Sequence, residues 1–245
     1  MGTLFAIGGG EISRLEALAI DEAIVKASGK SNPKLLFIPT ASNDHPGYIQ
    51  TIQNVYGKQL GCVVDVLQLI DNDKQHEDLQ RQIMDADIIY VGGGNTQKLL
   101  DVIKQFQLED TIKKSYQNGT ILSGVSAGSL CWFRLGSSET TDYNTSEQSM
   151  YKIIEGLNFI DAMHCPHYNE VDAHIDFDQK IIKNDSIGIG IEDHCAIEFK
   201  DNMYKVHKSK PHAKAFKVYK HNNDIIREEL VNTSDYTLID SLLKK

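Results

Sequence analysis

Short apolar runs alternate along this sequence with longer segments in which apolar residues recur every three to four positions. The apolar runs have the length of buried strands, and the longer segments have the spacing of amphipathic helices. This alternation is typical of a parallel sheet with helices on both faces. We expect strands at residues 3–7, 34–38, 63–67, 87–91 and 120–122, and helices at residues 11–27, 48–60, 71–84, 97–106 and 109–118.

The second half of the sequence predicts a different arrangement. We expect a surface loop at residues 136–148, strands at 162–165 and 186–191, a helix at 171–183, an antiparallel meander at 195–219 and a helical tail at 236–243. No linker rich in Pro, Gly or Ser divides the 245 residues. We therefore expect a single α/β domain over residues 1–245.

Charge and composition exclude several classes of function. The net charge is −9 and no basic stripe is present, so nucleic acid is not an expected partner. The apolar runs are too short for a signal peptide or a membrane span, which predicts a cytoplasmic protein without a membrane partner. The four cysteines show no C-x-x-C spacing and are expected to be reduced and mostly buried. No metal-ligand motif appears, so we expect neither metal nor cofactor.

Residues 124–128 read Gly-Val-Ser-Ala-Gly, which is the G-x-S-x-G pattern of a nucleophile elbow. In such a turn, small residues let the backbone fold sharply and expose the serine hydroxyl at the end of a strand. A Cβ at Gly124 or Gly128 would crowd the neighbouring strand or helix, and the N–H of Ala127 must stay free for an oxyanion. The alternative is a small-residue turn that only packs a helix on a sheet.

Three other turns are expected at the same sheet edge as the elbow: residues 92–96, 166–168 and 192–193. A serine needs a base and an orienting acid, and His167 with Glu192 fits these roles. Asp142 is the alternative acid. The alternative base, His164, lies within a predicted strand and is interpreted as a core histidine.

These four motifs together resemble, in order and spacing, the serine peptidases that include aspartyl dipeptidase (peptidase E) and cyanophycinase. The resemblance runs from about residue 4 to residue 199. It implies an α/β fold of the class I glutamine amidotransferase type. This is a flavodoxin-like three-layer sandwich with a mainly parallel sheet, here with a C-terminal antiparallel β extension.

The resemblance also implies roles for individual residues. Ser126 corresponds to the nucleophile and His167 to the base, while Glu192, or alternatively Asp142, corresponds to the acid. Backbone N–H groups form the oxyanion hole; the corresponding residues are Gly94 or Asn95, together with Ala127.

Recognition of an acidic substrate is less well matched. In aspartyl dipeptidase, an arginine downstream of the catalytic histidine is associated with the acidic side chain of the substrate. Residues 169–183 contain no arginine here, and Lys180 and Lys183 are their only cations. Arg134 is an alternative substrate-binding residue if it faces the site from the elbow helix.

We therefore expect a serine peptidase that cleaves small peptides through an acyl-enzyme. It is dipeptidase-like, with acidic or isoaspartyl peptides as candidate substrates. An esterase or amidase using the same site, and a non-catalytic binding protein on this scaffold, remain alternatives. A homodimer is among the expected assembly states.

Overall fold

The computed structural model describes residues 2–70, 72, 75–139, 151–222, 224–231 and 234–244. Its first part follows the expected alternation of strands and helices. In chain order, the elements are β1 (Thr3–Ile7), η1 (Ile12–Arg14), α1 (Leu18–Ala27), β2 (Lys34–Ile38), η2 (Thr40–Ser42), α2 (Pro46–Ile52), η3 (Gln53–Gln59), β3 (Val63–Val66), α3 (His76–Met84), β4 (Ile88–Val91), α4 (Thr96–Gln105), α5 (Glu109–Gln117), β5 (Ile121–Val125) and α6 (Ala127–Leu130).

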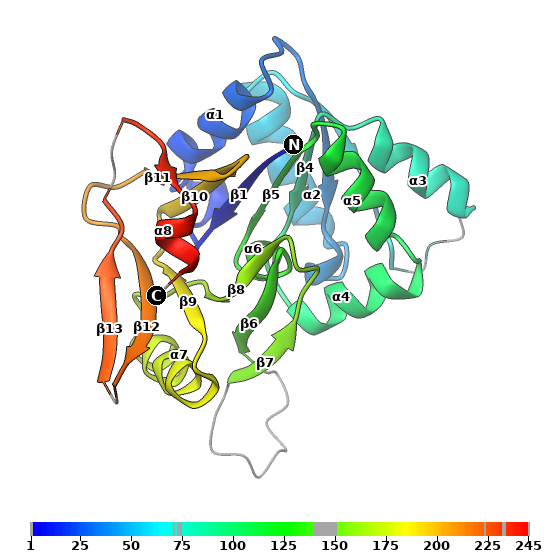
Figure 1. The fold of residues 1–245 in the computed structure, drawn as a ribbon. Helices are drawn as coiled ribbons and strands as arrows, with labels where there is room; N and C mark the ends of the chain where they lie inside the picture. Colours follow the sequence, from blue (N-terminus) through cyan, green and yellow to red (C-terminus); the bar gives the residue numbers. More distant parts are fainter. Residues whose placement is uncertain are drawn as a thin grey trace.

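The second part contains more strands than helices. Its elements are β6 (Phe133–Glu139), β7 (Tyr151–Glu155), β8 (Ile160–Cys165), α7 (Val171–Asn184), β9 (Ile187–Ile191), β10 (Cys195–Lys200), β11 (Met203–Lys208), β12 (Ala215–His221), β13 (Asp224–Glu229), β14 (Thr237–Leu238) and α8 (Asp240–Leu243). The two parts are drawn in the blue-to-green and green-to-red colours of Figure 1.

The first sheet confirms the expected α/β architecture. Among the described residues it has eight strands in the order β14-β11-β10-β1-β5-β4-β2-β3, and β1, β5, β4, β2 and β3 are parallel. Because side chains alternate along a strand, Phe5 and Ile7 pack with α1 and α2 on one face, whereas Leu4 and Ala6 share a core with α3, α4 and α5 on the other. The strands are therefore buried on both faces.

A second sheet, in the order β13-β12-β9-β8-β6-β7, corrects part of the expected topology. Strands β8 and β9 were expected in the first sheet but pair in this one, and α7 covers one of its faces. Residues 136–139 were expected in a surface loop and instead belong to β6, which pairs with β7 and β8. The sequence of β6 includes adjacent serines and lacks the alternation of apolar and polar residues by which strands are recognised, so this strand was not predicted.

The two sheets meet at the loop after β1, and the turns that follow β5, β8 and β9 lie around this loop. Ser126 N–H donates to the carbonyl of Ile7 at 3.1 Å, and His167 N–H donates to that of Gly8 at 3.2 Å. Gly9 forms an isolated parallel bridge with Asp193. One loop therefore binds the end of β5 from the first sheet and the ends of β8 and β9 from the second.

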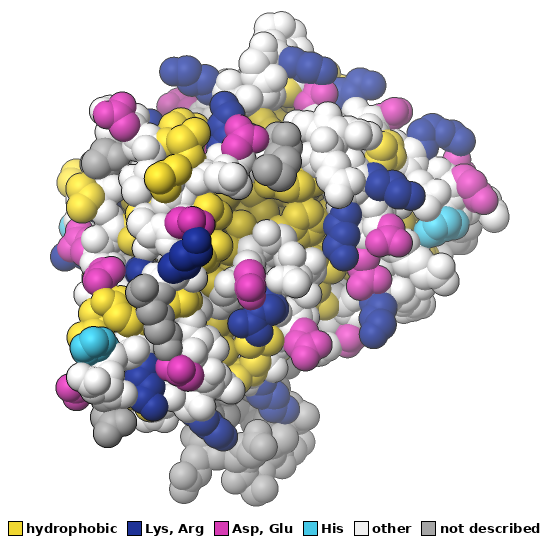
Figure 2. All heavy atoms as spheres, viewed as in Figure 1, with side chains coloured by type: hydrophobic (Ala, Val, Ile, Leu, Met, Phe, Trp, Pro, Cys, Tyr) yellow, Lys and Arg dark blue, Asp and Glu magenta, His cyan; other side chains and the backbone are white. Residues whose placement is uncertain are grey.

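The surface shows charged side chains of both signs dispersed over the face seen in Figure 2, with no basic patch gathered there. All four cysteines are buried and unpaired, as expected. In the part of the chain that the structure describes, no helix has both the length and the apolar character needed to cross a bilayer.

Candidate active site

Ser126 lies at the junction of β5 and α6 with a strained backbone. Its φ of 55° and ψ of −115° are unusual for a residue with a side chain. A Cβ on Gly124 would lie 2.3 Å from the carbonyl oxygen of Gly128, and one on Gly128 would lie 2.1 Å from that of Val91. Both glycines are therefore required for the close packing of the turn.

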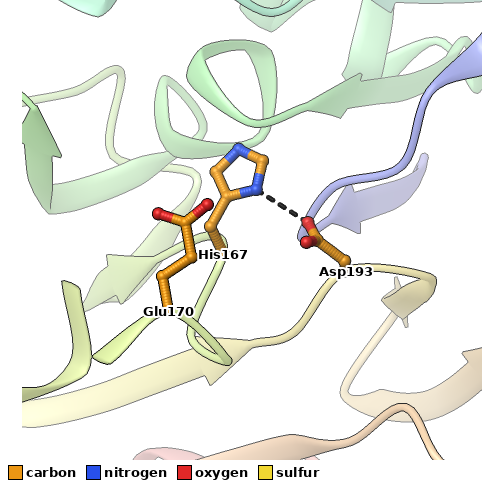
Figure 3. Close-up of side chains that lie close together, drawn as sticks. All are labelled: His167, Glu170 and Asp193. Carbon is orange, nitrogen blue, oxygen red and sulfur yellow. Dashed lines mark hydrogen bonds and ion pairs between the residues drawn. The ribbon is translucent and has the colours of Figure 1, made fainter. Parts of the chain in front are cut away.

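His167 and Asp193 complete a chain of hydrogen bonds with Ser126. The Nε2 atom of His167 lies 2.9 Å from Ser126 Oγ, and its Nδ1 atom lies 2.7 Å from Asp193 Oδ1. A carboxylate only accepts hydrogen bonds, so Nδ1 carries the proton and Nε2 is free to accept one from the serine. Figure 3 shows the bond between the imidazole and Asp193, with Glu170 on the other side of the ring.

Glu192 does not contact His167, and the prediction that it orients the base is wrong in this respect. Its Oε2 atom accepts a hydrogen bond from the backbone N–H of Lys214 at 2.8 Å. Glu192 and Asp193 are adjacent after β9, and neighbouring side chains in extended backbone point in opposite directions. Asp193 therefore faces the imidazole, while Glu192 faces away. The alternative acid, Asp142, lies outside the described residues.

Two residues that the sequence analysis did not single out fix Asp193 in place. The side-chain amide of Asn169 donates to Asp193 Oδ2 at 3.1 Å, and its oxygen accepts from the Asp193 N–H at 2.8 Å. A Cβ on Gly9 would lie 1.8 Å from Asp193 Oδ1 and 2.6 Å from the His167 ring. The glycine run after β1 thus makes room for the pair.

The pKa values of the pair shift as expected for a charge-assisted hydrogen bond. Burial opposes the charged imidazole, but the hydrogen bond to Asp193 and the charges of Asp193, Glu170 and Glu139 raise the pKa of His167 above its ordinary value of 6.5. The hydrogen bond from His167 lowers the pKa of Asp193, against the effect of burial.

His164 is a buried structural residue, as expected. Its Nδ1 atom lies 2.9 Å from the carbonyl oxygen of Ile189, and its Nε2 atom lies 2.8 Å from Ser129 Oγ. Burial lowers the pKa of His164 to about 3, so the ring is neutral near pH 7. The ring therefore links α6 to the second sheet.

Hydrogen bonding shows which of the expected oxyanion donors already has a partner. The N–H of Asn95 donates to Ala41 O at 2.8 Å, and the Asn95 side chain caps α4, so Asn95 is not a free donor and that alternative is wrong. Gly94 has a φ of +138° and lines a cleft with Ser126 and Ala127. Ala127 is the first residue of α6, where N–H groups have no partner within the helix. Gly94 and Ala127 remain the candidates.

The expected substrate-binding cations have other partners. Arg134 lies on β6 rather than on the elbow helix, and it pairs with Asp161 at the surface. Lys180 forms an ion pair with Asp176 and donates to Ser137 Oγ. Within the described ranges, neither of these residues nor Lys183 lines a cleft beside Ser126.

Two clefts lie beside Ser126. Ser126, His167 and Glu170 line both of them. The acyl-side cleft, of about 610 Å³, contains Gly94 and Ala127, the candidate oxyanion donors; its wall also includes Ser137, Ser138, Glu139 and Tyr151. The second cleft, of about 620 Å³, is lined by residues that include Glu11, Glu16, His45, Tyr48, Asp193 and His194. Each has the size of a small-molecule site.

A possible cation site overlaps the same residues. One ligand atom each from His167, Glu170 and Asp193 lies within 4.8 Å of the others. Both ring nitrogens of His167 are already hydrogen-bonded, to Ser126 and to Asp193. A metal ion held by all three side chains would therefore displace one of these two bonds.

Comparisons with known proteins show which family the chain is similar to. Residues 4–207 match the model of peptidase family S51. The chain is 33% identical over 230 residues to the uncharacterized peptidase YgaJ of Bacillus subtilis. The alignment covers 92% of this chain and 95% of that protein. It is 32% identical over 151 residues to peptidase E of Shewanella denitrificans, covering 61% and 60% of the two chains.

Solved structures show the same fold. A peptidase from an acI-B1 actinobacterium superposes with a TM-score of 0.72 at 21% identity, covering 97% of both chains. A putative peptidase E protein from Listeria monocytogenes gives a TM-score of 0.63 at 21% identity, covering 85% of this chain and 98% of that one.

Proposed function

Because the chain belongs to peptidase family S51 and is a serine peptidase, we propose that Ser126, His167 and Asp193 form its catalytic triad. The observation that carries this proposal is the continuous chain of hydrogen bonds from Ser126 Oγ through His167 to Asp193. A strained serine turn beside two clefts adds support, because buried structural serines do not need such a turn.

The reaction follows from these positions. His167 Nε2 takes the proton of Ser126 as Oγ attacks the peptide carbonyl, and Asp193 stabilises the resulting imidazolium. The N–H groups of Gly94 and Ala127 donate to the negative oxygen of the tetrahedral intermediate. His167 then protonates the leaving amine, which departs and leaves an acyl-enzyme. Water, deprotonated by His167, hydrolyses the ester and restores Ser126.

Small peptides are the substrates that the site supports best. Both clefts have volumes near 600 Å³, which is in the range of small-molecule sites and favours short substrates. Because Ser126 lines both clefts, we infer that the scissile bond lies where they meet. We infer dipeptidase-like activity rather than cleavage within a folded protein.

Labelling and hydrolysis test the proposal together. A fluorophosphonate should label Ser126 in the folded protein, and Ser126→Ala should abolish labelling and lower kcat/KM for dipeptides on the order of 10⁴-fold or more. Ser31→Ala, an exposed serine outside both clefts, is the matched control and should behave like the wild type. Hydrolysis that survives in Ser126→Ala would refute the nucleophile.

A further inference from the structure

We propose, on the premise of the catalytic assignment above, that Tyr48 is a positioning residue for the oxyanion hole. Its hydroxyl holds the glycine turn after β4, so that the N–H of Gly94 stays aimed at the carbonyl oxygen under attack. Tyr48 acts through the backbone of the turn and not on the substrate. The inference deepens the proposed function and rests on how the N–H groups of the turn are bound.

The turn at residues 92–95 is tied at both ends by backbone hydrogen bonds. Its first N–H donates to the carbonyl of Ile38 at 3.0 Å, and its last N–H donates to that of Ala41 at 2.8 Å. Between them, the N–H of Gly93 donates to the hydroxyl oxygen of Tyr48 at 3.4 Å. In the described part of the chain, Tyr48 is thus the one side chain that binds an N–H of this turn.

This pattern leaves the N–H of Gly94 for a ligand. It forms no hydrogen bond with another described residue, and Gly94 lines the acyl-side cleft with Ser126 and Ala127. Because both neighbouring peptides are held, the peptide that carries this N–H has fewer orientations to choose from than in a free glycine turn. A donor that is already oriented needs no reorganisation when negative charge develops on the substrate oxygen.

The ring of Tyr48, which comes from α2, packs directly on the turn. A Cβ on Gly92 would lie 2.9 Å from Tyr48 Cε1 and 3.2 Å from Phe37 Cε2. The rings of Tyr48 and Phe37 meet edge to face, with centroids 5.0 Å apart. On the other side, a Cβ on Gly93 would lie 3.4 Å from the Cβ of Ser126. A movement of the turn would therefore shift the oxyanion donor relative to the nucleophile.

Tyr48 keeps its proton at the pH values where the base is active. Burial raises the pKa of Tyr48 to about 12, and the negative charges of Glu11 and Asp21 also oppose its ionisation. The neutral hydroxyl oxygen accepts the bond from the Gly93 N–H with a lone pair. The contribution of Tyr48 should therefore be the same at every pH between about 6 and 9.

Tyr48→Phe tests the proposal, because it removes the hydroxyl and keeps the ring that packs on Gly92. For a dipeptide substrate, kcat and kcat/KM should both fall about tenfold with KM close to that of the wild type, since the donor acts only in the transition state. Loss of an oxyanion donor outright costs more, on the order of 10²- to 10³-fold. Tyr219→Phe, which removes a hydroxyl bonded to Glu228 outside both clefts, is the matched control and should behave like the wild type.

Two probes that occupy the oxyanion hole separate positioning from a general structural role. A fluorophosphonate should label Tyr48→Phe completely but about tenfold more slowly than the wild type. Phenylboronic acid, which forms a tetrahedral adduct with a reactive serine, should bind about tenfold more weakly. Calorimetry on Ser126→Ala, with and without Tyr48→Phe, should give the same affinity for the dipeptide, because ground-state binding does not use the oxyanion donor.

The possible results distinguish this inference from the catalytic assignment. A labelling rate and a boronate affinity equal to those of the wild type in Tyr48→Phe would overturn the inference. A raised KM with unchanged kcat would also overturn it, because Tyr48 lines the second cleft and its hydroxyl would then contact the substrate. Incomplete labelling would assign Tyr48 to the stability of the fold and contradict the inference as well. Failure of the wild type to react with fluorophosphonate or to hydrolyse any peptide would instead refute the proposed function.

Discussion

A single position decides which carboxylate of the Glu192–Asp193 turn reaches the imidazole. The sequence predicts an acid after β9, because the motif and the strand are both recognisable. It does not show which of two adjacent acids faces inward, since this depends on the bridge between Gly9 and Asp193, two residues far apart in the chain. For the same reason, the roles of Gly9 and Asn169 are absent from local sequence patterns.

Asp193→Asn should lower kcat/KM by about 10³ to 10⁴-fold, because an amide cannot hold the neutral imidazole in the required tautomer or stabilise its charged form. Glu192→Gln is the matched control. The Gln oxygen still accepts from the Lys214 N–H, so activity should stay close to that of the wild type. Dipeptide kinetics on both variants provide the measurement, and a larger loss in Glu192→Gln would restore the acid first expected.

The raised pKa of His167 sets the pH dependence of activity. His167 must be neutral to accept the serine proton, so kcat/KM should fall with decreasing pH, with a midpoint above 6.5. Glu170→Gln removes a negative charge that favours the imidazolium, and its midpoint should move to lower pH. A pH–rate profile of the two proteins checks this, and a midpoint that moves to higher pH would contradict the assigned role of the charge.

At the scale of elements, the sequence predicts the parallel sheet well and the second sheet poorly. Apolar runs such as those of β2 and β4 are buried on both faces and stand out from the helices around them. Strands β6 and β13 are rich in polar or charged residues, and their pairing partners are identified only by the tertiary structure.

Helix boundaries were less predictable than helix existence. The segment expected as one helix from residue 11 to 27 begins as the 3-10 turn η1, and α1 starts only at Leu18. A left-handed Leu15, with φ of 58°, separates the two. Glu11 and Ser13, which precede this break, line the second cleft.

At the scale of the whole molecule, a buried acid couples stability to pH. Asp21 is fully buried with a hydrogen bond from Tyr56 at 2.6 Å, and its Oδ2 atom has no partner among the described residues. Burial raises its pKa from 3.8 to about 7. The folded protein therefore keeps a proton that the unfolded chain releases, and stability should decrease as pH rises from about 4 to about 7.

Asp21→Asn should remove this dependence while keeping an acceptor for Tyr56. Above pH 7, the free energy of unfolding of the variant should exceed that of the wild type by at most ~4 kcal/mol. The wild type must there either ionise a buried carboxyl group or keep its proton against the solution pH. Urea unfolding at pH 4 and pH 8 measures both proteins. An equal difference between them at the two pH values would show that Asp21 does not titrate in this range.

Because the chain is synthesised from its N-terminus, the residues that meet between the two sheets are made at different times. The serine turn is complete once β5 and α6 have left the ribosome, whereas the carboxylate arrives only after β6, β7, β8, α7 and β9. On the proposed assignment, Ser126 is activated only once Asp193 has docked on Gly9. Each chain therefore gains its own hydrolytic activity only after residue 193 has been synthesised and has docked on the loop after β1.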